Sequence, residues 1–215
     1  MIRNVLSVLI VMFSVLYIFN LGPANGTYTM LFKLIPMILI IIFAILSEKP
    51  SKKYAFFIII GLIFCAIGDY TLQWFIIGLC FFLTGHLFYI TAFLTNRIQK
   101  TPKIVLPILL IYGVIMASII CGGLLVKNEI ILAIAVLAYI SIILLMGYSS
   151  WKTANKYAII GSILFIISDS ILAINRFTMD VPFSGQLIML TYYGAQFLFA
   201  YSISKYSVFR NKVIQ

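Results

Sequence analysis

Charged residues are scarce in this chain. They make up 9% of its 215 residues, against about 25% in soluble domains. Hydrophobic residues make up 64%, so a soluble fold of this size would lack the polar residues that cover a folded surface. The composition therefore excludes an ordinary soluble protein and predicts an all-α integral membrane protein.

Metal-binding and nucleotide-binding signatures are missing as well. Histidine occurs once, as His86, which argues against a site built from several histidines, and we expect no metal. Cys65, Cys80 and Cys121 lie in apolar runs without CxxC spacing, so we interpret them as small hydrophobic residues. No GxSxG, HExxH, Walker or GxGxxG pattern is present. We expect no cofactor.

The basic residues do not form a nucleic-acid site. The chain has 15 Lys and Arg against 5 Asp and Glu, a formal net charge of +10. These basic residues lie in short gaps between apolar runs rather than in a stripe among exposed aromatics. They indicate contacts with anionic lipids and membrane topology, and we expect no binding of nucleic acid.

Apolar runs long enough to cross a bilayer occur eight times. A spanning helix needs about 20 mostly apolar residues, and the runs are 4–19, 27–46, 54–70, 75–95, 102–121, 130–148, 155–175 and 185–205. Loop breakers occupy the gaps: Gly22-Pro23, Lys49-Pro50, Thr101-Pro102, Gly122-Gly123 and Val181-Pro182. No cleavage site follows the first run, so we expect that helix to be retained. No linker is long enough to divide the chain, which predicts one polytopic domain over 1–215.

The basic residues fall mainly on one side of these eight runs. That side carries 12 of them, the other side only Lys127 and Arg176, and Lys33 lies within a run. Cytoplasmic loops carry such an excess. We therefore expect both termini to be cytoplasmic in a multi-pass protein of a bacterial cell membrane.

Two segments 100 residues apart resemble each other. Gly61 and Asp69 in 61–69 (GLIFCAIGD) align with Gly161 and Asp169 in 161–169 (GSILFIISD). Because four crossings return the chain to the same side, this predicts two parallel four-helix repeats, 1–100 and 101–215. Chance similarity between apolar helices is the alternative.

Four ionisable residues lie inside predicted spans: Lys33, Asp69, His86 and Asp169. A charge at the bilayer centre costs about 2.5–3.5 kcal/mol, so each needs a reason. At about 1.5 Å per residue, Lys33, Asp69 and Asp169 all lie about 21–22 Å from the cytoplasmic edge. This shared level favours one intramembrane cavity. Alternatively, Lys33 reaches the outer headgroups and the carboxylates serve only as caps or water ligands.

Further polar side chains lie close to this level. His86 and Tyr89 are three residues apart, Tyr192 and Gln196 are four apart, and each pair shares a helix face. With Tyr193, they are candidates for binding or supporting a substrate. The alternatives are a histidine that only packs among aromatics and a tyrosine that only joins helices.

Five short motifs, in order, resemble the YhhN-like lysoplasmalogenase family of membrane proteins. They are FKLIP (32–36), GDYTL (68–72), GHLFY (85–89), SDSIL (168–172) and TYYGAQ (191–196). The resemblance extends from the second predicted helix to the eighth and implies an eight-helix fold. Tyr70-Thr71 departs from the small or apolar residues expected after Asp69, which bears on substrate preference.

The resemblance implies hydrolysis of the vinyl ether bond of lysoplasmalogens, giving a fatty aldehyde and glycerophospho-ethanolamine or -choline. It also implies that Asp69 and Asp169 are catalytic, with Lys33, His86, Tyr192 and Gln196 around them. A vinyl ether hydrolyses by protonation at carbon, so one carboxyl acts as acid and the other stabilises the oxocarbenium ion or activates water, as in glycosidases. The sequence does not say which is which.

The leading hypothesis is therefore a hydrolase of a lyso-ether phospholipid. A transporter or flippase for a lipid, proton or small metabolite is the alternative, because intramembrane carboxylates also form relays in carriers. Aldehyde release distinguishes the two hypotheses.

Overall fold

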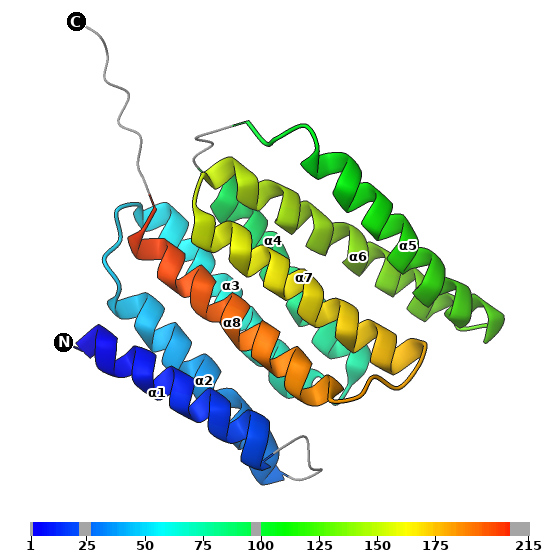
Figure 1. Ribbon diagram of the computed structural model, residues 1–215, viewed down its shortest axis with the longest axis horizontal. Helices are drawn as coiled ribbons and strands as arrows, with labels where there is room; N and C mark the ends of the chain where they lie inside the picture. Colours follow the sequence, from blue (N-terminus) through cyan, green and yellow to red (C-terminus); the bar gives the residue numbers. More distant parts are fainter. Residues whose placement is uncertain (1, 22–26, 96–99, 207–215) are drawn as a thin grey trace, which may run out of the picture.

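The computed structural model describes residues 2–21, 27–95 and 100–206 (Figure 1). The described residues are 86% helix and include no strand. Eight α-helices follow one another in these ranges: α1 (Ile2–Leu16), α2 (Thr27–Leu46), α3 (Lys52–Thr71), α4 (Phe75–Leu94), α5 (Val105–Val126), α6 (Ile130–Ser150), α7 (Lys156–Phe177) and α8 (Ser184–Ser204). A π-helical turn, Tyr17–Leu21, continues α1, and a 3₁₀ turn, Trp151–Thr153, follows α6.

The predicted helices match these bounds within a few residues, with one error. Gly122-Gly123 was expected to break the chain, but α5 continues to Val126. A helix satisfies its own backbone groups where no water is present, so glycine is tolerated inside an apolar span. The turn instead falls at Asn128, whose φ is 60°. The predicted breaker Gly22-Pro23 lies outside the described residues.

Six of the helical segments are long and apolar enough to cross a membrane: Ile2–Phe19, Lys52–Thr71, Phe75–Leu94, Val105–Val126, Ile130–Thr153 and Lys156–Phe177. In α2 the described apolar stretch, Met30–Leu46, is shorter. The eighth helix is more polar, and it packs between α2, α3 and α7 with Gln196 and Ser202 fully buried. These two polar side chains therefore face protein rather than lipid. The chain is a multi-pass integral membrane protein.

The helices run side by side as antiparallel hairpins (Figure 1). The pairs α3–α4 and α7–α8 form the centre, where α3 also packs on α8. The α1–α2 pair flanks this centre through contacts of α2 with α3 and α8, and the α5–α6 pair flanks it through contacts of α6 with α4 and α7. Within the described residues, no Cα of α4 lies within 8 Å of a Cα of α7. Side chains, not backbones, fill the space between these two helices.

Two glycines allow the central hairpins to close. A Cβ at Gly61 would lie 2.4 Å from Cε1 of Tyr89, and one at Gly161 would lie 2.9 Å from the ring of Phe199. In each hairpin an aromatic ring of the second helix thus rests directly on a glycine of the first. Both rings are fully buried.

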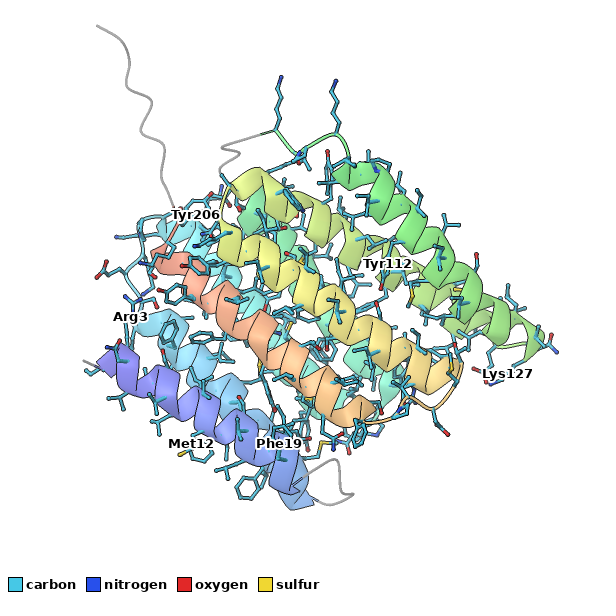
Figure 2. All side chains as sticks on the ribbon, viewed as in Figure 1. Arg3, Met12, Phe19, Tyr112, Lys127 and Tyr206 are labelled. Carbon is cyan, nitrogen blue, oxygen red and sulfur yellow. The ribbon has the colours of Figure 1, made fainter. Side chains whose placement is uncertain are left out.

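One end of the bundle is fixed by polar contacts. The side chains of Ser51 and Asn155 cap α3 and α7, accepting hydrogen bonds from the backbone N–H groups of Tyr54 and Tyr157. Arg3 donates to Ser204 Oγ at 3.2 Å. Figure 2 shows Arg3 and Tyr206 at this end and Lys127 at the opposite end. The described ends of the chain therefore lie on one side of the bundle.

Candidate active site

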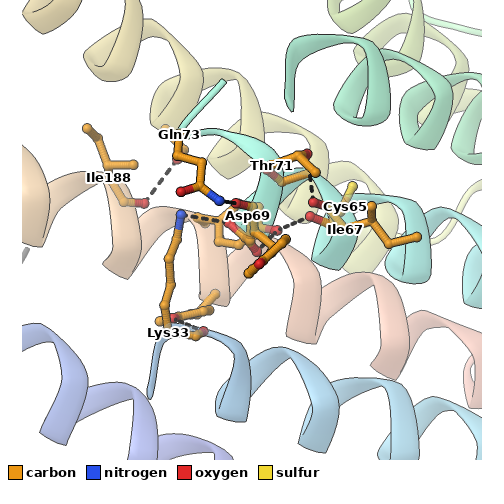
Figure 3. Close-up of polar contacts among 12 residues, drawn as sticks. Lys33, Cys65, Ile67, Asp69, Thr71, Gln73 and Ile188 are labelled. Atoms are coloured by element: carbon orange, nitrogen blue, oxygen red, sulfur yellow. Dashed lines mark hydrogen bonds and ion pairs between the residues drawn. The ribbon is translucent and has the colours of Figure 1, made fainter. Parts of the chain in front are cut away.

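A buried ion pair joins α2 to α3. Lys33 Nζ lies 3.0 Å from Asp69 Oδ1, and the two side chains are only 12% and 3% exposed. The other carboxylate oxygen, Oδ2, accepts a hydrogen bond from the Tyr192 hydroxyl of α8 at 2.6 Å. Figure 3 shows Lys33 extending from its helix towards Asp69. Lys33 thus points to a carboxylate within the bundle, not to the headgroup region.

The second carboxyl, that of Asp169 on α7, has a different environment. Its Oδ2 accepts a hydrogen bond from the hydroxyl of Tyr139 on α6. The one salt bridge within the described residues is Lys33–Asp69, so Asp169 has no cation partner there. The two acidic residues of the predicted repeat thus differ: one is paired with an ammonium group and the other with a phenol.

Tyr139 was missing from the sequence prediction. It lies in the run AVLAYISI of α6, where it is 8% exposed. Its sequence signal was a single hydroxyl at an intramembrane position, which hydropathy alone does not distinguish from a packing aromatic.

Both carboxyls line one cavity. Its walls come from α2 to α8, and besides Asp69 and Asp169 its polar lining groups include Lys33, Tyr139 and Tyr192. The remaining surface is mainly aliphatic or aromatic, with Met116, Ile120, Val136 and Ile143 as examples. The cavity offers about 80 Å³ to the centre of a water molecule, enough for several waters on the scale of about 10–15 Å³ each. It combines a site for acid–base chemistry with a lining suited to a hydrocarbon chain.

The other predicted polar residues lie behind this cavity. His86 is fully buried, with Nδ1 2.6 Å from the carbonyl of Phe82, and its ring meets Phe165 and Tyr139 edge to face. Tyr89 donates to Gln196 Oε1 at 2.6 Å. None of His86, Tyr89 and Gln196 lines the cavity. Of the three, His86 contacts residues that line the cavity, namely Phe82 and Tyr139.

Tyr193 supports the site through the backbone. Its hydroxyl donates to the carbonyl of Lys33 at 2.7 Å, which ties α8 to α2 beside the ion pair. Tyr70 and Thr71, where the sequence departs from the resembled family, do not line the cavity, and Tyr70 is exposed. Within the described residues, no group of three or more His, Cys, Asp or Glu side chains is arranged to hold a metal ion.

Comparison with known proteins identifies the family of the chain. A sequence model described as the YhhN family matches residues 28–203. The chain belongs to the YhhN family. The match includes nearly the whole of every helix that contributes to the cavity and every residue that lines it.

The curated relatives of this chain carry the name of an enzyme, lysoplasmalogenase. The chain is 33% identical over 177 residues to lysoplasmalogenase TMEM86A of Homo sapiens, covering 73% of this chain and 68% of the relative. It is 32% identical to lysoplasmalogenase TMEM86A of Bos taurus, with the same coverage. It is 30% identical to lysoplasmalogenase TMEM86B of Homo sapiens, covering 72% of this chain and 66% of the relative. No solved structure matches the chain significantly.

Proposed function

We propose that this protein is a lysoplasmalogenase, which cleaves the vinyl ether bond of a lysoplasmalogen within the membrane. The observation that carries the proposal is the cavity shared by Asp69 and Asp169, because its lining is otherwise mainly apolar. The names of the relatives supply the substrate class. The products are a fatty aldehyde and glycerophospho-ethanolamine or glycerophospho-choline.

The two carboxyls take different roles in this proposal. Asp169, whose side-chain partner is the neutral phenol of Tyr139, gives its proton to the alkenyl carbon next to the ether-bearing carbon. The electron pair of the double bond forms the new C–H bond and leaves an oxocarbenium ion. Asp69, the ion-paired carboxylate, stabilises this cation and accepts a proton from the water that adds to it.

Collapse of the resulting hemiacetal releases the aldehyde and the glycerol hydroxyl. One water is consumed, and one proton passes from Asp169 to the substrate while another passes from water to Asp69. Returning that proton to Asp169 restores the starting state. Lys33, Tyr139, Tyr192 and Tyr193 hold the carboxyls in place, and His86, Tyr89 and Gln196 support the wall behind them.

The proposed topology has eight crossings, two parallel repeats and both termini in the cytoplasm of a bacterial cell. Its support is the charge asymmetry of the sequence and the matching arrangement of the two halves, in which α2 packs on α3 and α8 while α6 packs on α7 and α4. A cysteine introduced at Lys127 should then react with an impermeant maleimide added outside intact cells. The same substitution at Lys152 should react only after the cells are lysed.

The experiment that tests the function uses purified protein in detergent with a lysoplasmalogen as substrate. Time-dependent release of fatty aldehyde is expected. The matching lipid with a saturated ether chain should release none, because it has no double bond to accept the proton. Absence of aldehyde together with movement of the intact lipid across sealed vesicles would replace the enzyme with a lipid carrier.

A further inference from the structure

An arginine lies at the end of the bundle opposite the described chain ends. Arg176 is in the last turn of α7, and its guanidinium carbon lies 4.3 Å from the ring centroid of Phe75, the first residue of α4. Its side chain is exposed. It lines an open surface depression together with the remaining lining residues Trp74, Phe75, Ile76, Ile77 and Leu132.

This depression adjoins the cavity of the candidate active site. Phe75 lines both of them. Phe177, which also lines the cavity, meets Phe75 edge to face, with the ring centroids 5.4 Å apart. Aromatic pairs lie about 4.5–7 Å apart by this measure, so the two rings are in contact. The two rings therefore lie where the cavity, which the carboxyls line, adjoins the depression, which Arg176 lines.

The spacing along α7 fits one molecule that contacts both sides. Arg176 follows Asp169 by seven residues, which is a rise of about 10 Å on nearly the same helix face. Side chains in helices lean towards the N-terminus, so the guanidinium is carried back towards Asp169. In a lyso-ether phospholipid, seven bonds of about 1.5 Å join phosphorus to the alkenyl carbon that Asp169 protonates, and they span roughly 9 Å. This length is close to the rise of about 10 Å between the two residues.

Few other cationic side chains near the cavity could bind a phosphate. Lys33 is paired with Asp69, and Lys127, at the C-cap of α5, does not line the cavity or the depression. In the described part of the chain the one salt bridge is Lys33–Asp69, so Arg176 has no carboxylate partner there. Guanidinium groups bind phosphate through two parallel hydrogen bonds.

We propose that Arg176 binds the phosphate of the substrate headgroup, with the glycerol passing alongside the Phe75–Phe177 pair to bring the vinyl ether to the carboxyls. This inference rests on the proposed function and adds the residue that selects a phospholipid over a neutral ether lipid. A purely structural arginine would instead act only through its contact with Phe75 and the C-terminal dipole of α7.

The test compares two substrates of equal chain length, a lysoplasmalogen and the 1-O-alkenylglycerol that lacks the phosphate. Arg176→Gln should lower kcat/KM for the lysoplasmalogen roughly 10- to 100-fold, the range of a lost charged hydrogen bond, and leave kcat/KM for the alkenylglycerol unchanged. Arg176→Lys should recover part of the loss. The control, Lys127→Gln, should match the wild type on both substrates. Equal losses on both substrates, or no loss on either, would overturn the inference.

Binding separates this inference from the proposed function. If the wild type releases no aldehyde from either substrate, the lysoplasmalogenase proposal fails, and calorimetric titration in detergent with the saturated 1-O-alkyl analogues then tests Arg176. Tighter binding of the phosphate-bearing analogue, lost in Arg176→Gln, supports the site. Equal affinities in the two proteins refute it. Inorganic phosphate that binds as tightly as the lipid would assign the site to free phosphate instead.

Discussion

Replacing Lys33 with methionine should destabilise the protein by breaking the buried ion pair. Lys33→Met keeps an unbranched side chain one atom shorter but leaves the Asp69 carboxylate, 3% exposed, without its cation 3.0 Å away. Removing one partner of a buried ion pair costs about 3–5 kcal/mol. The Tyr192 hydrogen bond to Oδ2 remains, so we expect the lower end, about 3 kcal/mol. That corresponds to a fall in unfolding temperature of about 10 °C for a chain of this size.

The double variant Lys33→Met/Asp69→Asn isolates the cause. It removes both charges, and the Asn side-chain oxygen still accepts from Tyr192, so most of the lost stability should return. Thermal unfolding of the purified proteins in one detergent measures both effects, with Lys127→Met as the control for loss of a positive charge. Our reasoning is refuted if Lys33→Met unfolds at the wild-type temperature, or if the double variant is no more stable than Lys33→Met.

Two further variants test packing and the second carboxyl. Gly61→Ala places a Cβ 2.4 Å from Cε1 of Tyr89 and should lower the free energy of unfolding by about 1–3 kcal/mol. The control, Gly122→Ala, meets nothing within 4 Å and should unfold at or slightly above the wild-type temperature. Equal unfolding temperatures of the two variants would contradict the close approach of α3 and α4. Tyr139→Phe removes the hydroxyl that donates to Asp169 and should slow aldehyde release about tenfold, the effect of one lost hydrogen bond near 1.4 kcal/mol. Tyr148→Phe, on the same helix but away from the cavity, is the control, and an unaltered rate in Tyr139→Phe would remove that residue from the site.

The helices were predictable because length and apolar composition decide them locally. The sequence also predicted the shared depth of Lys33, Asp69 and Asp169, since depth follows from counting residues along a helix. All three line the cavity.

The direction in which each side chain points was not predictable in the same way. His86 is fully buried yet faces Phe165 and the ring of Tyr139 from behind the cavity. Direction depends on which helices are neighbours, and that follows from packing between segments far apart in the chain. The same reason explains why Tyr139 was missed: only the pairing of α6 with α7 brings its hydroxyl to Asp169.

The initial rate of aldehyde release by Asp69→Asn and Asp169→Asn tests the central claim most directly. Asp180→Asn serves as the matched control, since Asp180 is exposed and does not line the cavity. We predict that the rate of each cavity variant falls at least about 10²-fold, which is the usual contribution of a positioned acid or base. Both variants should remain folded in the membrane, and Asp180→Asn should keep the wild-type rate. Wild-type rates in both cavity variants would contradict the account.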